Sequence, residues 1–301
     1  MKTTRKNFIK TGAILAGGFL FNGNKIVSAL NLNTKRLKKV RNNFFIYNER
    51  GGTIGVYIDG DDIVVVDSQF ADTAKNMHNE ISNKKINLLF NTHHHGDHTS
   101  GNLYFKDYTS VITAHENCVE LQKKATQGTE REKDQVYANV TFNDEWTMNL
   151  GNEKVWAKHI CPAHTAGDAV IHFVNSNVVH VGDLVFNKTY PFIDLNGGGD
   201  LYGWVDYLNK LNEYFDTDTV FIFGHAKNDD FVTGSKDDLT AMKNYLSALI
   251  DFVSNGITEG KTKEEISSVE KVPGVVGVEE TRPGFKKMNL ERAYDLLIKN
   301  N

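Results

Sequence analysis

The sequence predicts an α/β protein in which short strands and amphipathic helices alternate along the chain. Runs of β-branched and aromatic residues, bounded by turn-forming residues, are typical of strands and begin at residues 44–68. Later runs of the same kind are separated by stretches with apolar residues at helical spacing. At 301 residues, the chain is long enough for one large α/β domain or two modest ones.

The first half of the chain predicts a strand meander followed by helices and strands in alternation. The runs FFIYNE, TIGVYID and DIVVVDS within residues 44–68 are separated by Gly-Gly and Asp-Gly-Asp-Asp turns. A helix is expected over residues 71–83, followed by the apolar run INLLFN, which predicts a buried strand. A strand over 110–113 and a helix over 114–125 complete this half.

The second half continues the alternation. We expect strands over 153–160, 168–174 and 177–182, and helices over 201–215 and 235–254. The tail from 257 to 301 predicts short charged helices packed on the outside. With four prolines in the chain and no Pro- or Ser-rich linker, nothing indicates a domain boundary, so a single domain over residues 30–301 is expected.

The first 29 residues are typical of an export signal. Basic residues come first, an apolar run (TGAILAGGFLF) follows, and Val27-Ser28-Ala29 provides the small side chains that a signal peptidase recognises. The apolar run is too short to span a bilayer. The segment TRKNFIK resembles a weakened twin-arginine motif, and the alternative is a disordered or amphipathic tail. We therefore expect a periplasmic or secreted protein that has no membrane attachment once the signal is removed.

The charge balance argues against a nucleic-acid substrate. The full chain has 34 basic and 38 acidic residues, and the first 29 residues contain five of the basic ones and no acidic one. The mature chain would therefore have a net charge of −9. Phosphate backbones are bound by broad positive surfaces, so a small-molecule substrate is expected, with no nucleic-acid partner. The sequence leaves the oligomeric state open.

Two cysteines, Cys118 and Cys161, leave two alternatives open. In an oxidising compartment they could form a disulfide, but sequence does not show whether their Cα atoms come close enough. Two unpaired thiols are an equally good interpretation.

Four of the eleven histidines lie within residues 93–98, in the stretch FNTHHHGDHTSGN. Because alternate residues of an extended segment share a side, His93 and His95 can point the same way while His94 points elsewhere. Gly96 permits a tight turn, after which Asp97 and His98 lie at a second point in space. Neutral imidazoles and a carboxylate are zinc ligands, and iron or manganese also accept them. The order therefore predicts a metal site.

This stretch resembles the signature of the metallo-β-lactamase superfamily, which includes β-lactamases, glyoxalase II-type thioesterases, lactonases and RNase Z-type nucleases. The family has three further ligands in a fixed order, and CPAHTAGD, HVGDLVF and VFIFGHA contain candidates for each: His164, Asp183 and His225. The resemblance covers roughly residues 44–228. It implies an αβ/βα sandwich of two facing sheets with helices outside and the metal site at one edge.

The resemblance also implies a role for each residue and two zinc ions per chain. His93, His95 and His164 would hold the first metal, and Asp97, His98 and His225 the second, with Asp183 bridging the two. Asp67 matches a position where the family has a carboxylate near the first metal, so it is expected to hydrogen-bond to a ligand. An aspartate at the bridging position is similar to glyoxalase II and the lactonases. The lactonase tyrosine three residues later is replaced by Phe186.

These features predict an exported, zinc-dependent hydrolase in which a hydroxide bridging two metals attacks a carbonyl. Asp97 would also receive and return a proton. The substrate could be a β-lactam, lactone, ester or thioester. The alternative is a mononuclear iron persulfide dioxygenase, which has the same fold and ligand residues. The remaining histidines are interpreted as structural: His78, His115, His159, His172 and His180.

Overall fold

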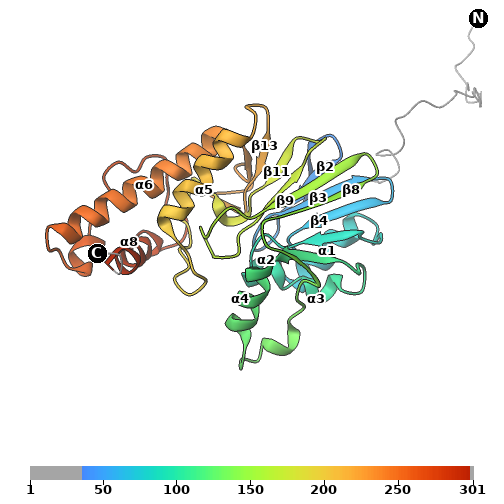
Figure 1. Ribbon diagram of the computed structural model, residues 1–301, viewed down its shortest axis with the longest axis horizontal. Helices are drawn as coiled ribbons and strands as arrows, with labels where there is room; N and C mark the ends of the chain where they lie inside the picture. Colours follow the sequence, from blue (N-terminus) through green and yellow to red (C-terminus); the bar gives the residue numbers. More distant parts are fainter. Residues whose placement is uncertain (1–35, 299–301) are drawn as a thin grey trace, which may run out of the picture.

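The computed structural model describes residues 36–298, and two facing β-sheets with helices on their outer sides form its body (Figure 1). The predicted export signal, residues 1–29, lies outside the described residues. Among residues 36–298, no helix combines the length and the apolar character that crossing a membrane requires.

The first sheet has its strands in sequence order, from β1 to β7. They are β1 (Leu37–Arg41), β2 (Phe44–Tyr47), β3 (Ile54–Asp59), β4 (Asp62–Val66), β5 (Leu88–Phe90), β6 (Ile112–His115) and β7 (Val140–Phe142). The first four are antiparallel, and β4 to β7 are parallel. Parallel neighbours need crossovers, which here contain α1 (Ala71–Glu80), α2 (Gly96–Thr99), α3 (Asn102–Phe105), α4 (Glu116–Thr126) and a 3-10 turn at Glu132–Asp134.

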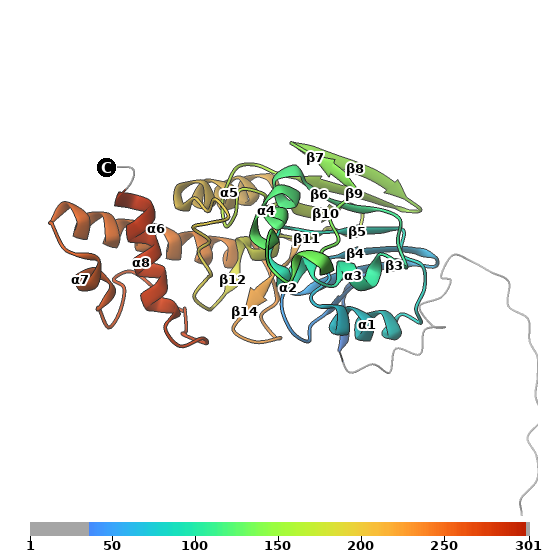
Figure 2. The same cartoon turned by 90° about the horizontal axis from the view of Figure 1, so that it is seen from below.

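The second sheet has the order β15-β13-β11-β10-β9-β8, and a two-stranded sheet pairs β12 with β14. The strands are β8 (Glu145–Leu150), β9 (Glu153–Lys158), β10 (Val170–Phe173), β11 (Val178–His180), β12 (Phe186–Asn187), β13 (Val220–Ile222), β14 (His225–Ala226) and β15 (Thr233–Gly234). A 3-10 turn spans Gly182–Leu184. The helices are α5 (Leu201–Tyr214), α6 (Lys236–Thr258), α7 (Lys263–Ser267) and α8 (Phe285–Leu297), and Figure 2 shows α6, α7 and α8 extending away from the sheets.

Alternation along the strands divides the apolar residues among three layers of core. In β4, Val64 and Val66 face the second sheet, whereas Ile63 and Val65 pack with α1 residues such as Met77. A third cluster lies between the outer face of the second sheet and helices α5, α6 and α8. Three apolar layers between four structural layers make up an αβ/βα sandwich. The predicted fold is confirmed.

The predicted elements agree with the structure best where the pattern is strongest. The meander over 44–68 and the helices α5 and α6 are as expected, whereas β1, β7 and β8 were not expected. Both β1 and β8 are edge strands with exposed polar residues, so they lack a continuous apolar run. The predicted helix over 71–83 ends at Glu80, and Ser82 and Asn83 adopt positive φ angles.

The tail does more than cover the outside. Helix α8 places Leu290 and Ala293, both fully buried, in the same apolar cluster as α5 and α6.

The two cysteines are both free thiols, with Cys118 buried and Cys161 partly exposed.

Candidate metal centre

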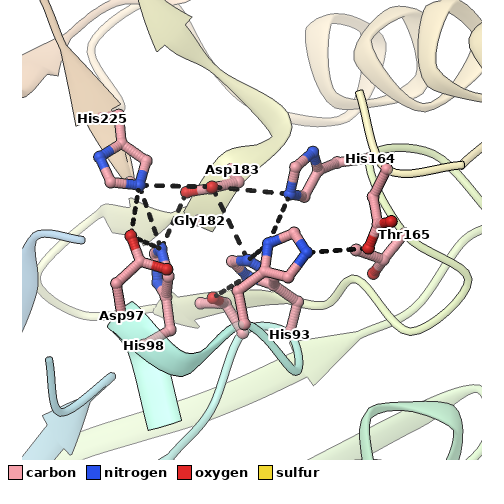
Figure 3. A network of polar contacts seen from close by, with 12 residues as sticks. His93, Asp97, His98, His164, Thr165, Gly182, Asp183 and His225 are labelled. Atoms are coloured by element: carbon pink, nitrogen blue, oxygen red, sulfur yellow. Dashed lines mark hydrogen bonds and ion pairs between the residues drawn. The ribbon is translucent and has the colours of Figure 1, made fainter. Parts of the chain in front are cut away.

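The predicted site residues lie where strands of both sheets end. The segment 93–98 follows β5, Asp183 follows β11, and His225 follows β13. Because β4 and β5 are parallel, and β11 and β13 are parallel, each pair has its carboxyl ends at one edge of its sheet. His164 lies in the loop between β9 and β10. All seven side chains are brought together at this edge (Figure 3).

The first cluster is a three-histidine group of His93, His95 and His164. The Nδ1 atom of His95 lies 2.9 Å from Nε2 of His93 and 3.1 Å from Nε2 of His164. His93 and His164 are fully buried, and the side chain of His95 is 18% exposed. The three nitrogen atoms therefore face a common point, at which a metal ion could be held.

The second cluster is a mixed group of Asp97, His98 and His225. The Nε2 atom of His225 lies 3.1 Å from Oδ2 of Asp97 and 3.5 Å from Nε2 of His98. His98 is fully buried, whereas the side chain of Asp97 is 31% exposed. This group also fits a metal ion.

Asp183 lies between the two groups, as Figure 3 shows. Its Oδ1 atom is 3.1 Å from Nε2 of His98, and its Oδ2 atom is 3.4 Å from Nε2 of His225. On the other side, Oδ2 lies 3.7 Å from Nε2 of His93 and 3.6 Å from Nε2 of His164. One carboxylate is thus within reach of both clusters.

Asp67 directly contacts a member of the mixed group. Its Oδ2 atom lies 2.7 Å from Nδ1 of His98, a member of the mixed group. It reaches the three-histidine group only through Thr92, whose hydroxyl donates to Asp67 and lies 3.0 Å from Nδ1 of His93. Asp67 directly follows β4, beside β5, so it lies under the turn that both groups share.

Asp194, the partner of His95, was not predicted from the sequence. Its Oδ2 atom lies 2.9 Å from Nε2 of His95, and its Oδ1 atom accepts hydrogen bonds from the backbone N–H groups of Asn196 and Gly197. His94 points away from His93 and lies buried beside Asp194, with Nε2 3.5 Å from Oδ2. An aspartate two residues before an Asn-Gly turn was the available signal, because such residues cap turns.

These partners fix the tautomers of two histidines. A ring nitrogen that faces a carboxylate or a hydroxyl acceptor carries the proton, so the other nitrogen has a free lone pair. The free nitrogens are Nε2 of His93 and Nδ1 of His95, and both face the interior of the site. His98 faces a carboxylate with each ring nitrogen, Asp67 at Nδ1 and Asp183 at Nε2, so a metal bound at Nε2 would displace a proton. Lone pairs 2.9 Å apart repel each other unless a cation lies between them. The donor set therefore fits a metal ion.

Burial and charge shift the acid–base equilibria of the two groups in opposite directions. Burial lowers the pKa of His164 to about 3 and that of His93 well below its usual value. Burial also disfavours the charged form of His98, but Asp183, Asp67 and Asp97 outweigh it and raise the pKa of His98 well above the usual value. The pKa of Asp183 is lowered despite its burial, because His225 and His98 stabilise the carboxylate.

Two glycines permit the backbone to approach the site closely. A Cβ atom at Gly52 would lie 2.1 Å from Cε1 of His98, and a Cβ atom at Gly224 would lie 2.0 Å from Oδ1 of Asp183. Neither space could hold even a methyl group, so glycine is required at both positions.

Two cavities open beside the centre. One of about 260 Å³ is lined by Asp97, Asp183, His225, Phe186, Phe192 and Arg282, together with His95 and Gly96. A larger one of about 540 Å³ is lined by His94, His95, Phe192 and residues of α4 and the loop after it, including Lys124 and Arg131. A substrate can therefore reach the exposed side of both groups.

None of the histidines interpreted as structural belongs to a potential metal-binding cluster within residues 36–298. His115 caps α4 and stacks on His159, with ring centroids 4.0 Å apart. His180 hydrogen-bonds to the carbonyl oxygen of Thr53, and His78 to that of Lys84. His172 packs against Trp156 and Phe215.

The chain is similar to known proteins in sequence and in fold. The model of the metallo-beta-lactamase superfamily matches residues 47–225. A probable hydroxyacylglutathione hydrolase of Schizosaccharomyces pombe is 26% identical over 193 residues, which are 62% of this chain and 68% of that protein.

Solved structures show the same fold. The DIM-1 metallo-beta-lactamase has a TM-score of 0.59 at 19% identity, covering 70% of this chain and 96% of that one. A metallo-beta-lactamase from Pontibacter korlensis has a TM-score of 0.57 at 16% identity, with 70% and 98% covered. A double mutant of the sec-alkyl sulfatase PisA1 has a TM-score of 0.66 at 14% identity, covering 87% of this chain. The chain spans half the length of that sulfatase.

Proposed function

Because the chain belongs to the metallo-beta-lactamase superfamily, whose members are mostly metal-dependent hydrolases, we propose that it is an exported hydrolase with two metal ions that cleaves a carbonyl derivative. The observation that supports this most is the pair of clusters within reach of one carboxylate, Asp183. The nitrogen and carboxylate donors suit zinc best, and iron or manganese are compatible with them.

Each residue has a part in this proposal. His93, His95 and His164 would hold one metal, Asp97, His98 and His225 the other, and Asp183 would bridge them. When bound, two divalent cations would polarise a carbonyl oxygen and make hydroxide available near neutral pH. Asp67 and Asp194 hold His98 and His95 in the tautomers that such binding requires.

Asp97 is the candidate for proton transfer. Its side chain lines the smaller cavity and is partly exposed, whereas Asp183 is buried. Contacts with His98 and His225 overcome the effect of burial and lower the pKa of Asp97, so it is a carboxylate at neutral pH. Its place on the cavity wall makes it the side chain to which the proposal assigns proton transfer to the leaving group.

The scissile bond is that of an ester, thioester, lactone or β-lactam. Similarity to a probable hydroxyacylglutathione hydrolase supports a thioester. Export, proposed from residues 1–29, instead favours substrates found outside the cytoplasm. A panel of nitrocefin, a lactone, a thioester and an aryl ester separates these bonds by the rate at which each is hydrolysed.

Metal analysis of the purified mature chain tests the proposal. We expect two zinc ions per chain, and we expect His95→Ala to abolish both metal binding and hydrolysis, because His95 is a member of the three-histidine group. His172→Ala removes a half-buried histidine away from the centre and should keep the metals. One iron per chain with oxygen consumption, or a His95→Ala variant that hydrolyses without metal, would overturn the proposal.

A further inference from the structure

The C-terminal tail contacts the loop that borders the metal centre, although the match to the family model ends at residue 225. The backbone N–H of Glu279 donates to the carbonyl oxygen of Lys188, at 3.0 Å. Further along, Asn289 donates to the carbonyl oxygen of Pro191 at 2.8 Å, and the Arg292 guanidinium donates to that of Ile193. The same loop contains Phe192 and Asp194, so the tail fixes part of the cavity wall.

These contacts bring Arg282 to the centre. Its side chain lines the 260 Å³ cavity together with Asp97, Asp183 and His225. The position of Arg282 is defined by its neighbours, because Thr281 hydrogen-bonds to Thr189 and the guanidinium lies 5.3 Å from the centre of the Phe285 ring. Within residues 36–298, Arg282 forms no ion pair and its guanidinium donates no hydrogen bond. Its five N–H donors therefore remain available to a ligand.

The acidic groups of this cavity are already engaged. Oδ2 of Asp97 lies 3.1 Å from His225, and Oδ1 of Asp183 lies 3.1 Å from His98. A guanidinium that faces a cavity in a chain with an excess of acidic residues is a local positive charge with a fork of donors. That fork matches the two oxygens of an oxyanion, whereas a neutral substrate offers this exposed guanidinium no charged partner.

We propose that Arg282 binds an oxyanion on the substrate, and hence that the hydrolysed compound is an acid such as a carboxylate-bearing ester or thioester. The inference rests on the proposed function, because it names the class of substrate for the same site. It assigns specificity to a residue outside the segment that matches the family model.

Paired substrates test the assignment. 4-Nitrophenyl hemiglutarate and its methyl ester have the same chromophore and acyl chain and differ only in the negative charge. For Arg282→Gln we expect KM for the hemiglutarate to rise about 10- to 100-fold, the range for a lost charge-assisted hydrogen bond. KM for the methyl ester should change less than about twofold. An equal rise in KM for both substrates would indicate a general effect of the substitution and not the loss of an anion contact. Arg282→Lys should lie between Arg282→Gln and the wild type, since it keeps the charge and loses the fork.

Arg41→Gln is the matched control, because Arg41 ends the edge strand β1, lines neither cavity beside the centre and forms no ion pair within residues 36–298. It should leave both KM values unchanged. Equal losses of both substrates in Arg282→Gln, no loss in either, or a selective loss in Arg41→Gln would each overturn the inference while the proposed function stands.

Binding of glutarate, measured by calorimetry on the metal-loaded chain, gives a readout that needs no turnover. We expect Arg282→Gln to bind glutarate at least about fivefold more weakly than the wild type, and equal dissociation constants would overturn the inference. If the wild-type chain retains metal and binds glutarate through Arg282 but hydrolyses no substrate of the panel, the proposed function fails and the anion site stands.

Discussion

The three-histidine group and the mixed group differ in depth and in chemistry. The side chains of His93 and His164 are at most 1% exposed, whereas Asp97 and His225 in the mixed group are 31% and 10% exposed. The first group has only imidazoles, and the second includes a carboxylate that lines the cavity. A metal held by the three-histidine group would therefore be bound more deeply, and one held by the mixed group would be more accessible from the cavity.

The supporting contacts of the two groups differ as well. Asp194, on a loop fixed by the C-terminal tail, orients His95 of the three-histidine group. Asp67 orients His98 of the mixed group from the end of β4, within the first sheet. The two orienting carboxylates thus come from different halves of the chain, and each can be substituted separately.

The largest expected effect is the loss of one histidine from either group. His164→Ala should lower kcat/KM about a thousandfold or more, because a bound Lewis acid contributes several kcal/mol to transition-state stabilisation. His225→Ala should keep the more deeply bound metal and lose the other. Elemental analysis and kcat/KM for both variants check this comparison. If His225→Ala bound no metal while His164→Ala retained one, the more deeply bound metal would lie in the mixed group and not in the three-histidine group.

A smaller effect is expected from the carboxylates that orient the histidines. Asp194→Asn and Asp67→Asn should each weaken metal binding about 10- to 100-fold, because an amide no longer stabilises the imidazole in the required tautomer. The effect of Asp194→Asn should be confined to the three-histidine group, and that of Asp67→Asn should be larger in the mixed group. Competition with a chelator measures the two affinities. If both variants weakened both metals equally, the groups would not be separable.

Much of the site could be predicted because it follows strands with strong signals. INLLFN precedes the histidine cluster, and VVH and VFI precede Asp183 and His225. A continuous apolar run predicts a buried strand, and such a strand ends at the edge of its sheet. The position of the polar residues that directly follow it is therefore known from the sheet. The four-layer fold was implied by the resemblance; the alternation of strands and helices is consistent with it but would not have predicted it.

The contacts that could not be predicted come from loops and from the tail. Asp194 and Arg282 lie in segments without regular apolar spacing, and their positions depend on long-range contacts such as that between Asn289 and Pro191. Asp67 lies within reach of two histidines of the same short turn, of His98 directly and of His93 through Thr92. Local sequence does not encode which of them the carboxylate faces.

The smallest expected effect is a difference in how pH affects the two groups. Burial lowers the pKa of His164 to about 3, so no proton competes with a metal at this residue down to about pH 4. His98 is buried too, but its surrounding carboxylates raise its pKa well above the usual value, so a metal in the mixed group must displace a proton at neutral pH. Affinity there should fall about tenfold for each pH unit below neutrality, because one proton is displaced. On equilibration at falling pH, elemental analysis should therefore find one metal lost before the other. In the Asp67→Asn variant, which removes one of these carboxylates, the pH dependence of that loss should weaken. Simultaneous loss of both metals would show that proton competition does not distinguish the groups.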